Sequence, residues 1–389
     1  IFSTLNDRGL QLSDSDIFKS KFYKYYINQA NKVTKDSKER ENFIEKNFSI
    51  KWKKLEELCS SVFRMSSSNP MDELFTRYMY YERSKRGIKD TTTISLRKFY
   101  ENPDAKSLSK SSRSENSKVD KYYLLNEQTF ENLITLANFW DDVYAQNDSR
   151  FSAEVLRKLF VLKYAPNNLW TALTSVYFMA NKDNQNQLDS TKFEIFLEKI
   201  TAFIFAYAIV RPGVNALRTP VYSEMVKLTN GEDADFRDFK FDIENTKNMF
   251  LNFSFYNMRP VTKAMLFWWT FYNPNQMLPK KDPKYQIEHI FANNRPSDTL
   301  SDKIRESLGN KSLLERRINI RASDYRFCDK KQCYIGTRDQ NEKSDGTHIN
   351  ELQQLANEKN DFTEQDIIDR NEKIISSFMD FLKKNDLAK

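Results

Sequence analysis

The chain has 389 residues and a mass of 46.2 kDa, which is enough for two or three domains. Hydrophobic residues make up 39% of it, charged residues 30%, and only 7 residues are glycine, so the composition indicates a globular protein and argues against a β-sandwich or glycine-rich phosphate loops. The net charge of +7 is compatible with a nucleic-acid partner and does not by itself establish one.

The three cysteines, Cys59, Cys328 and Cys333, give no disulfide framework. Cys328 and Cys333 lack the two further nearby ligands that a structural zinc ion needs, so we interpret both as ordinary thiols. The longest apolar run, at residues 203–210, is too short to cross a bilayer, and no signal peptide is visible. These features predict no membrane partner and a cytoplasmic location, which is a reducing compartment.

Residues 1–26 contain a turn signal at residues 6–9 (NDRG). Ser13 and Asp14 are then placed to cap a helix that starts near Asp16. Two interpretations of this segment stay open. In the first, which rests on the family resemblance given below for residues 5–19, Arg8 and Lys19 contact a nucleotide or another phosphate in a binding pocket. In the second, the segment is a turn followed by an ordinary capped surface helix.

Residues 31–275 predict a helical region, because apolar residues recur there at helical spacing. The polar stretch at residues 84–118 predicts a mobile loop or linker outside the core. The segment at residues 192–210 is apolar around most of its circumference and predicts a central buried helix. The region is either a scaffold or a DNA-holding surface. Its basic residues are interspersed with acids, which favours the scaffold.

Residues 276–389 contain the most informative pattern. His289, one of only two histidines, follows Glu288 in the run QIEHIF, and two asparagines, Asn310 and Asn319, follow at defined offsets. This ordered set is typical of an HNH, or ββα-metal, nuclease. A histidine titrates near neutral pH and therefore suits the activation of water. Carboxylate and amide oxygens suit a hard divalent cation such as Mg²⁺ or Mn²⁺.

These properties predict a role for each residue. We expect His289 to be the general base, Glu288 and Asn319 to hold Mg²⁺ or Mn²⁺, and Asn310, beside Gly309, to tie the connecting loop so that His289 is oriented. Cations cluster around this set and are predicted to contact DNA phosphates. They are Arg316, Arg317, Arg321, Arg326, Lys330 and Lys331.

Residues 286–375 resemble the C-terminal HNH domain of the GmrSD-type modification-dependent restriction endonucleases. The resemblance rests on EHI at 288–290, LGNKSLL at 308–314, RRINIRASDYRFCDKK at 316–331 and FTEQDIIDRNEKI at 362–374. It implies the base, the middle asparagine and a metal ligand at His289, Asn310 and Asn319. The chain departs from the family at Ala292, where proline is usual, and that difference concerns the exit of the strand.

Residues 5–19 (LN-x-RG-x-x-L-x-x-x-D-x-x-K) are similar to the closing part of the N-terminal ParB-like domain of the same family. The DGQQR motif of that domain does not occur in this sequence. We therefore expect the core of that domain to have been removed or to lie upstream of Ile1, and any nucleotide dependence to require it.

The sequence thus predicts a mostly α protein, a helical scaffold with a C-terminal ββα-metal nuclease domain. The predicted divisions are a ParB-like closing segment at 1–30, a helical region at 31–275 and an HNH domain at 276–389. The predicted activity is metal-dependent endonucleolytic hydrolysis of DNA in the restriction of foreign or modified phage DNA. Two alternatives stay open, a catalytically decayed HNH-fold binding module and an RNA-directed nuclease. Arg370 is expected to reach either a phosphate or a carboxylate.

Overall fold

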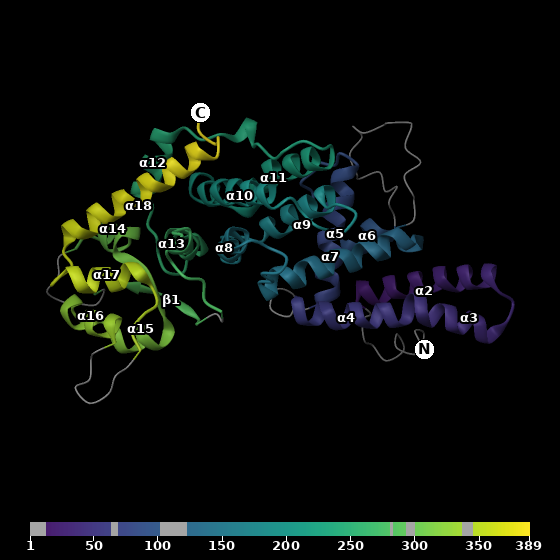
Figure 1. Cartoon of the computed structure of the whole chain (residues 1–389). Coiled ribbons are helices and arrows are strands. Elements are labelled where there is room, and N and C mark those ends of the chain that lie inside the picture. The colour runs from purple at the N-terminus through teal and green to yellow at the C-terminus, as the bar shows by residue number, and fades with distance from the viewer. Residues whose placement is uncertain (1–12, 64–68, 102–122, 281–282, 293–299, 337–344) are drawn as a thin grey trace. The chain divides into compact units, whose positions relative to one another are not determined.

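The computed structural model describes all residues except 1–12, 64–68, 102–122, 281–282, 293–299 and 337–344. The described chain is mostly helical, with a single pair of antiparallel strands in a C-terminal region of short helices (Figure 1). The prediction of a mostly α protein is therefore confirmed. The chain divides into two compact units, which we describe separately.

Unit 1 comprises residues 1–151, 171–189 and 221–234. Its helices include the following: α2 (Asp14–Val33), α3 (Ser37–Ile44), α4 (Ile50–Val62), α5 (Pro70–Lys85), α6 (Leu96–Glu101) and α7 (Glu127–Ala145). The core is built largely from aromatic rings, with Trp52 stacked on Phe130 at a centroid distance of 5.8 Å. Ser13 caps α2 by accepting from the backbone of Asp16, as its position in the sequence predicts.

The polar stretch at residues 84–118 is partly ordered. Helix α6 lies within it, and its Phe99 and Tyr100 are buried in unit 1. The prediction of a loop outside the core is therefore wrong for residues 96–101, because two adjacent rings supply enough apolar surface to anchor a short helix in a polar sequence.

Unit 2 comprises residues 152–170, 190–220 and 235–389. Two helices, α9 (Leu169–Asn181) and α11 (Val214–Thr229), contain residues of both units. The following elements belong to unit 2: α8 (Ala153–Leu162), α10 (Ser190–Val210), α12 (Ile243–Asn252), α13 (Pro260–Phe271), β1 (Tyr285–His289), α14 (Asp302–Arg305), β2 (Lys311–Glu315), α15 (Arg316–Ala322), α16 (Phe327–Ile335), α17 (Asn350–Glu358) and α18 (Glu364–Lys384).

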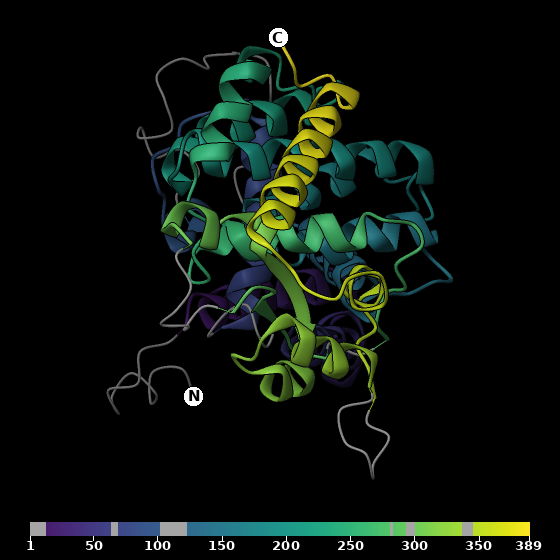
Figure 2. The same ribbon diagram turned by 90° about the vertical axis from the view of Figure 1, so that its left-hand side faces the viewer.

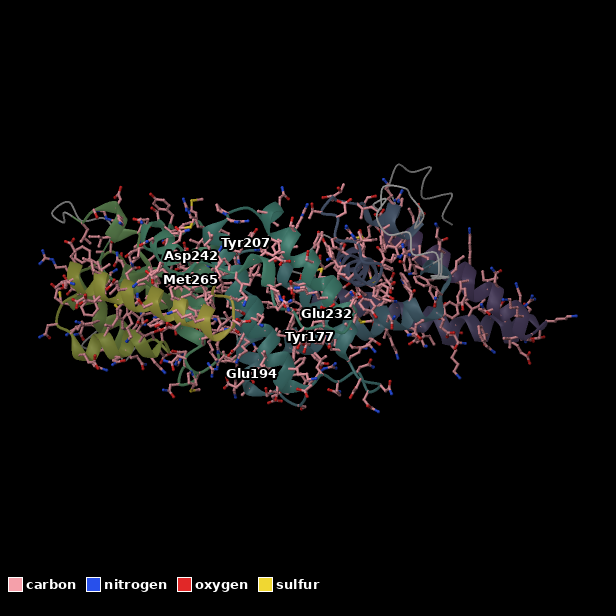
Figure 3. The ribbon with its side chains drawn as sticks, turned by 90° about the horizontal axis from the view of Figure 1, so that it is seen from above. Tyr177, Glu194, Tyr207, Glu232, Asp242 and Met265 are labelled. Atoms are coloured by element: carbon pink, nitrogen blue, oxygen red, sulfur yellow. The ribbon has the colours of Figure 1, made fainter. Side chains whose placement is uncertain are left out.

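Helix α10 is the buried helix that the sequence predicts, and most of its residues between Phe193 and Ile209 are inaccessible. Glu194 and Tyr207 lie toward its two ends, and the buried Met265 lies in α13 (Figure 3). On α13, Trp268 packs edge-on against Phe378 of α18. The full length of α18 is seen in Figure 2, and α18 begins with a capping box at Thr363.

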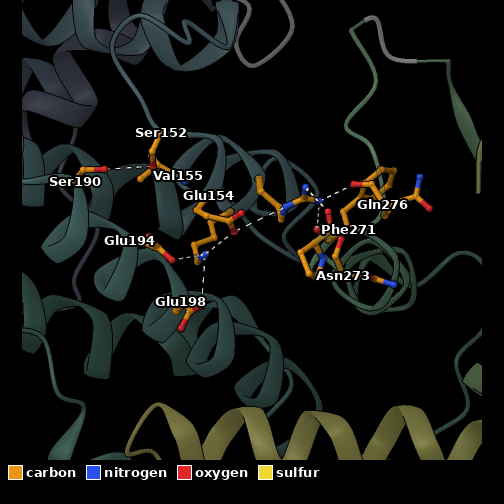
Figure 4. A network of polar contacts seen from close by, with 12 residues as sticks. Ser152, Glu154, Val155, Ser190, Glu194, Glu198, Phe271, Asn273 and Gln276 are labelled. Carbon is orange, nitrogen blue, oxygen red and sulfur yellow. Dashed lines mark hydrogen bonds and ion pairs between the residues drawn. The ribbon is translucent and has the colours of Figure 1, made fainter. Parts of the chain in front are cut away.

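A polar network joins α8 to the chain that follows α13 (Figure 4). Arg157 donates through Nη1 to the carbonyls of Phe271, Asn273 and Gln276, at 2.9, 3.1 and 2.8 Å. The adjacent Lys158 is buried and pairs with Glu194 at 2.9 Å. Arg157 thereby satisfies carbonyls at the end of α13 and fixes the start of the segment that leads into β1.

Strands β1 and β2 form the sheet on which the predicted site residues lie. They pair antiparallel, with Tyr285 opposite Glu315 and His289 opposite Lys311. The Tyr285 ring packs on two phenylalanines of α13. Helix α15 follows β2 directly, and the short helix α14 and a 3-10 turn lie between β1 and β2.

Candidate functional site

His289 lies at the last position of β1, with its side chain 13% exposed. Its Nε2 atom is 2.8 Å from Lys311 Nζ, and Glu306 Oε1 is 3.6 Å away. The completely buried Lys311 also donates to Asn257 Oδ1 at 2.6 Å and to Glu306 Oε2 at 2.8 Å. An ammonium group has three hydrogens, so these three acceptors satisfy it fully.

The contact with Lys311 determines which nitrogen of the His289 imidazole carries the proton. An ammonium group has no lone pair, so Nε2 accepts in this contact and the neutral ring carries its proton on Nδ1. Burial, followed by the positive charges of Lys311 and Lys330, lowers the pKa of His289 from 6.5 to about 3. The ring is therefore neutral at neutral pH, and its Nε2 lone pair is held by Lys311.

Glu288 is buried and is held by two other buried residues. Its Oε1 atom accepts from Tyr334 Oη at 2.7 Å and pairs with Lys330 Nζ at 2.8 Å. Burial raises the pKa of Glu288, and the attraction of Lys330 opposes that shift. Lys330 is 1% exposed and also donates to the carbonyl of His289. The Lys330 ammonium therefore stabilises the end of β1 from the protein interior. The prediction that Lys330 is a surface cation that contacts DNA is wrong, because its side chain is buried.

Asn319 lies on the same face of β1 as Glu288. Its Nδ2 atom donates to Gln286 Oε1 at 2.9 Å, and residues two apart in a strand point to the same face. The contacts of Glu288 among the described residues run through Oε1 and those of Asn319 through Nδ2. Glu288 Oε2 and Asn319 Oδ1 are hard oxygen atoms, the type of ligand that Mg²⁺ and Mn²⁺ prefer.

A further carboxylate, Asp324, lies near both candidate groups. Its negative charge acts to raise the pKa of Glu288 and of His289. Among the described residues no group of three or more histidine, cysteine, aspartate or glutamate side chains is arranged to hold a metal ion. A divalent ion here would therefore depend on few protein ligands, on water and on the substrate phosphate.

Asn310 ties the residues that follow His289 to the chain before β2. Its Oδ1 atom accepts from the backbone N–H of Phe291 at 2.8 Å, and its Nδ2 atom donates to the carbonyls of Phe291 and Arg305. The backbone N–H of Ile290 also donates to the Asn310 carbonyl. These bonds fix the exit of β1 and so restrict where the His289 ring can lie.

Arg370 of α18 stabilises the chain around Asn310 through hydrogen bonds to its backbone. It donates through Nη1 to the carbonyls of Leu308, Gly309 and Lys311, and it pairs with the carboxylate of Glu351. Of the two predicted partners, the structure therefore shows a carboxylate. Position 309 requires a glycine, because α18 approaches the backbone there so closely that a Cβ atom would clash with the carbonyl oxygen of Ile367.

The remaining predicted DNA contacts differ in exposure. Arg316, Arg317 and Arg326 are exposed. Arg321 and Lys331 are half-buried, and each donates to a backbone carbonyl, of Asp345 and Lys359 respectively. The prediction of phosphate contacts therefore rests mainly on the first three.

Of the two predicted phosphate contacts near the N-terminus, Lys19 lies within the described residues. Arg8 lies outside the described residues. Lys19 belongs to unit 1 and pairs with Glu56 at 2.9 Å, and its ammonium lies 5.7 Å from the centre of the Trp52 ring. Its contact with a phosphate stays a prediction.

A surface pocket opens onto His289 and Glu306. The turn before α13 supplies the rest of its lining, which consists of Tyr256, Asn257, Met258 and Arg259. Sequence reasoning missed Lys311, Glu306 and Asn257 as neighbours of His289, because they come from three separate segments. The available signal was a lysine directly after Asn310, at the start of a strand that contains the adjacent apolar residues Leu313 and Leu314.

Comparison with known families addresses this part of the chain. No curated protein gives a significant match, and within the described residues no helix is long and apolar enough to span a membrane. Residues 240–377 match the family described as GmrSD restriction endonucleases, C-terminal domain. The match contains the β1–β2 hairpin with His289 and leaves residues 1–30 outside it. The match supports a GmrSD-type restriction endonuclease C-terminal domain at residues 240–377.

Proposed function

We propose that this domain is an HNH endonuclease that hydrolyses DNA phosphodiesters with Mg²⁺ or Mn²⁺, in the restriction of foreign or modified phage DNA. The observation that carries the proposal is a neutral histidine at the end of β1, lining an open pocket, with its strand exit held by Asn310. The family match supports a restriction nuclease acting on DNA. The metal ion and the general base are proposed in addition to what the family match supports.

In this proposal His289 takes the proton of the attacking water. The Nε2 lone pair is available only when Lys311 gives up its bond to it. A phosphate in the adjacent pocket offers Lys311 a charged acceptor, which an ammonium group prefers to a neutral ring nitrogen. Removing a cation from His289 and placing an anion beside it both favour the protonated ring, so the substrate itself makes His289 a stronger base.

Glu288 and Asn319 would hold the metal ion through Oε2 and Oδ1. When bound, the ion supplies positive charge that neutralises the scissile phosphate and the leaving oxygen. Lys330 already balances the charge of Glu288. Its role in the proposal is to fix the carboxylate and the carbonyl of His289, so that the two neighbouring residues keep a constant geometry.

One observation favours the alternative of a decayed binding module. Lys311 occupies the one nitrogen of His289 that bears a lone pair. If that contact never opens, the domain binds DNA without cutting it. The two functions differ in metal-dependent turnover.

The experiment is a substrate panel for the full chain with Mg²⁺, Mn²⁺ or EDTA. Plain plasmid, glucosylated-hydroxymethylcytosine plasmid, single-stranded DNA and RNA are each incubated with wild type and with His289→Ala. The proposal expects cutting of duplex DNA by wild type with a divalent ion and not with EDTA, and none by the variant. Cutting of RNA in place of DNA would favour the RNA-directed nuclease. DNA binding without cutting under any metal condition would favour the decayed module.

A further inference from the structure

The turn formed by Tyr256, Asn257, Met258 and Arg259, called here the 256–259 turn, is rigid. The backbone N–H of Arg259 donates to the Tyr256 carbonyl at 3.0 Å, and that carbonyl also accepts from Thr262 Oγ1 at 2.8 Å. The Asn257 side chain accepts from Lys311, the same lysine that contacts His289. The turn is thus attached both to α13 and to the polar cluster beside His289.

The side chains of this turn have no evident role in the core. Met258 is 94% exposed and Tyr256 is 45% exposed. The Arg259 guanidinium lies over the rings of Phe253 and Tyr256, at 4.6 and 5.4 Å from their centres. A guanidinium stacked on rings keeps its N–H groups at the edge free to donate. Among the described residues, no acidic side chain forms an ion pair with Arg259.

The turn lies beside the site at which the proposed function places the substrate phosphate. Its four residues line the same pocket as His289 and Glu306. The one carboxylate in that lining is balanced by Lys311 at 2.8 Å, so it leaves the pocket without a net negative charge from this pair. A DNA strand that brings a phosphate to His289 through this pocket would contact these side chains.

We propose that the 256–259 turn contacts the DNA strand that His289 hydrolyses. Arg259 binds a phosphate beside the scissile one, and Tyr256 and Met258 lie against the bases. Aromatic and unbranched apolar side chains contact or wedge between bases without reading sequence, and arginine binds phosphate through its planar fork. The inference rests on the proposed function, because it uses the position of a phosphate at His289.

The chain offers matched controls for a test. Met277 is 81% exposed in the same unit and does not line this pocket. Arg237, also in this unit, has an exposed side chain and pairs with Asp235 at 3.1 Å. The variants are therefore Met258→Ala beside Met277→Ala, and Arg259→Gln beside Arg237→Gln. All four residues are at the surface, so we expect all four variants to fold.

Binding of a fluorescent duplex is measured by anisotropy with EDTA at several salt concentrations, and cleavage is measured with Mg²⁺. Arg259→Gln should lower the slope of log affinity against log salt by about 1, as expected for one lost phosphate contact. Met258→Ala should weaken binding by about 5- to 10-fold, a little over 1 kcal/mol, with the slope unchanged. The two controls should match wild type.

The result that would overturn the inference is equality of Met258→Ala and Arg259→Gln with their controls in affinity, slope and cleavage rate. If His289→Ala still abolishes cleavage in that case, the proposed function stands and only the role of the turn fails. If His289→Ala cuts like wild type, the proposed function fails whatever the turn does.

Discussion

The aromatic core of unit 1 and the β1–β2 hairpin of unit 2 are stabilised in opposite ways. Around Trp52 in unit 1, rings of α2, α4 and α7 pack within about 6 Å of one another, and ion pairs such as Lys51–Glu131 stay partly exposed. Around the hairpin, Lys311 and Lys330 are at most 1% exposed, and Asn310 is completely buried.

The two regions differ in the free energy of burying their side chains. Burying rings gains free energy wherever they pack, whereas burying an ammonium group costs several kcal/mol unless its partners compensate. Buried charges with shifted pKa values also gather more often at functional sites than elsewhere. The hairpin is therefore a part of the chain in which positioning of polar groups, and not stability alone, explains the residues present.

The largest loss of stability is expected for Arg370→Met. The substitution removes the Arg370 donor from the carbonyls of Leu308, Gly309 and Lys311 and from Glu351, which keeps its bond from the Trp269 indole. We expect the free energy of unfolding to fall by about 3–5 kcal/mol in urea titrations. Lys384→Met, which removes an exposed pair with Glu198, should cost less than about 1 kcal/mol. Equal costs would show that the buried network contributes no more than a surface pair.

Lys330→Met tests the buried pair with Glu288. Removing the ammonium leaves the carboxylate uncompensated, so we expect a loss of about 3 kcal/mol in the same measurement. The double variant Glu288→Leu with Lys330→Met should recover at least half of that loss, because neither charge is then buried. A double variant as unstable as the sum of both single variants would contradict this account of the pair.

Phe130→Leu tests the other side of the comparison. The Phe130 ring is fully buried and contacts Phe22, Phe48 and Trp52. We expect a loss of about 1–2 kcal/mol from the smaller side chain and its residual cavity. DNA cleavage at a temperature where both proteins are folded should equal that of wild type. A changed cleavage rate would show that unit 1 does more than provide structure.

The smallest effect is a dependence on pH. Burial acts to raise the pKa of Glu351, and Arg370 more than offsets this, so the pKa lies below the ordinary 4.5. A carboxyl group with a lowered pKa in the folded state contributes stability above its unfolded pKa and loses it as pH falls through the folded pKa. Wild type should therefore lose stability below about pH 4.5 more steeply than Arg370→Met. Parallel stability profiles of the two proteins would contradict this.

Much of the fold and part of the site could be predicted from the sequence. The sequence correctly predicted that Ser13 caps a helix, because the cap pattern is local. The apolar period predicted α10, and the motif predicted that Asn310 lies beside the exit of β1. The role of Lys330 could not be predicted, because a lysine in a basic run reads as a surface cation and only tertiary packing places it against Glu288.

The environment of His289 was beyond sequence reasoning for the same reason. Lys311, Glu306 and Asn257 meet through strand pairing and loop packing, and nothing in their local sequence indicates that they share one ammonium-centred cluster. The catalytic assignment of His289, Asn310, Glu288 and Asn319 stays a prediction until cleavage is measured.

The most direct test compares two histidine variants. His289 and His348 are the two histidines of the chain, and His348 is exposed and does not line the pocket that His289 and Glu306 line. Single-turnover cleavage of duplex DNA with Mg²⁺ should fall by at least about 100-fold in His289→Ala, the usual size of a general-base contribution, and stay unchanged in His348→Ala. Equal rates in the two variants would show that His289 is not the base.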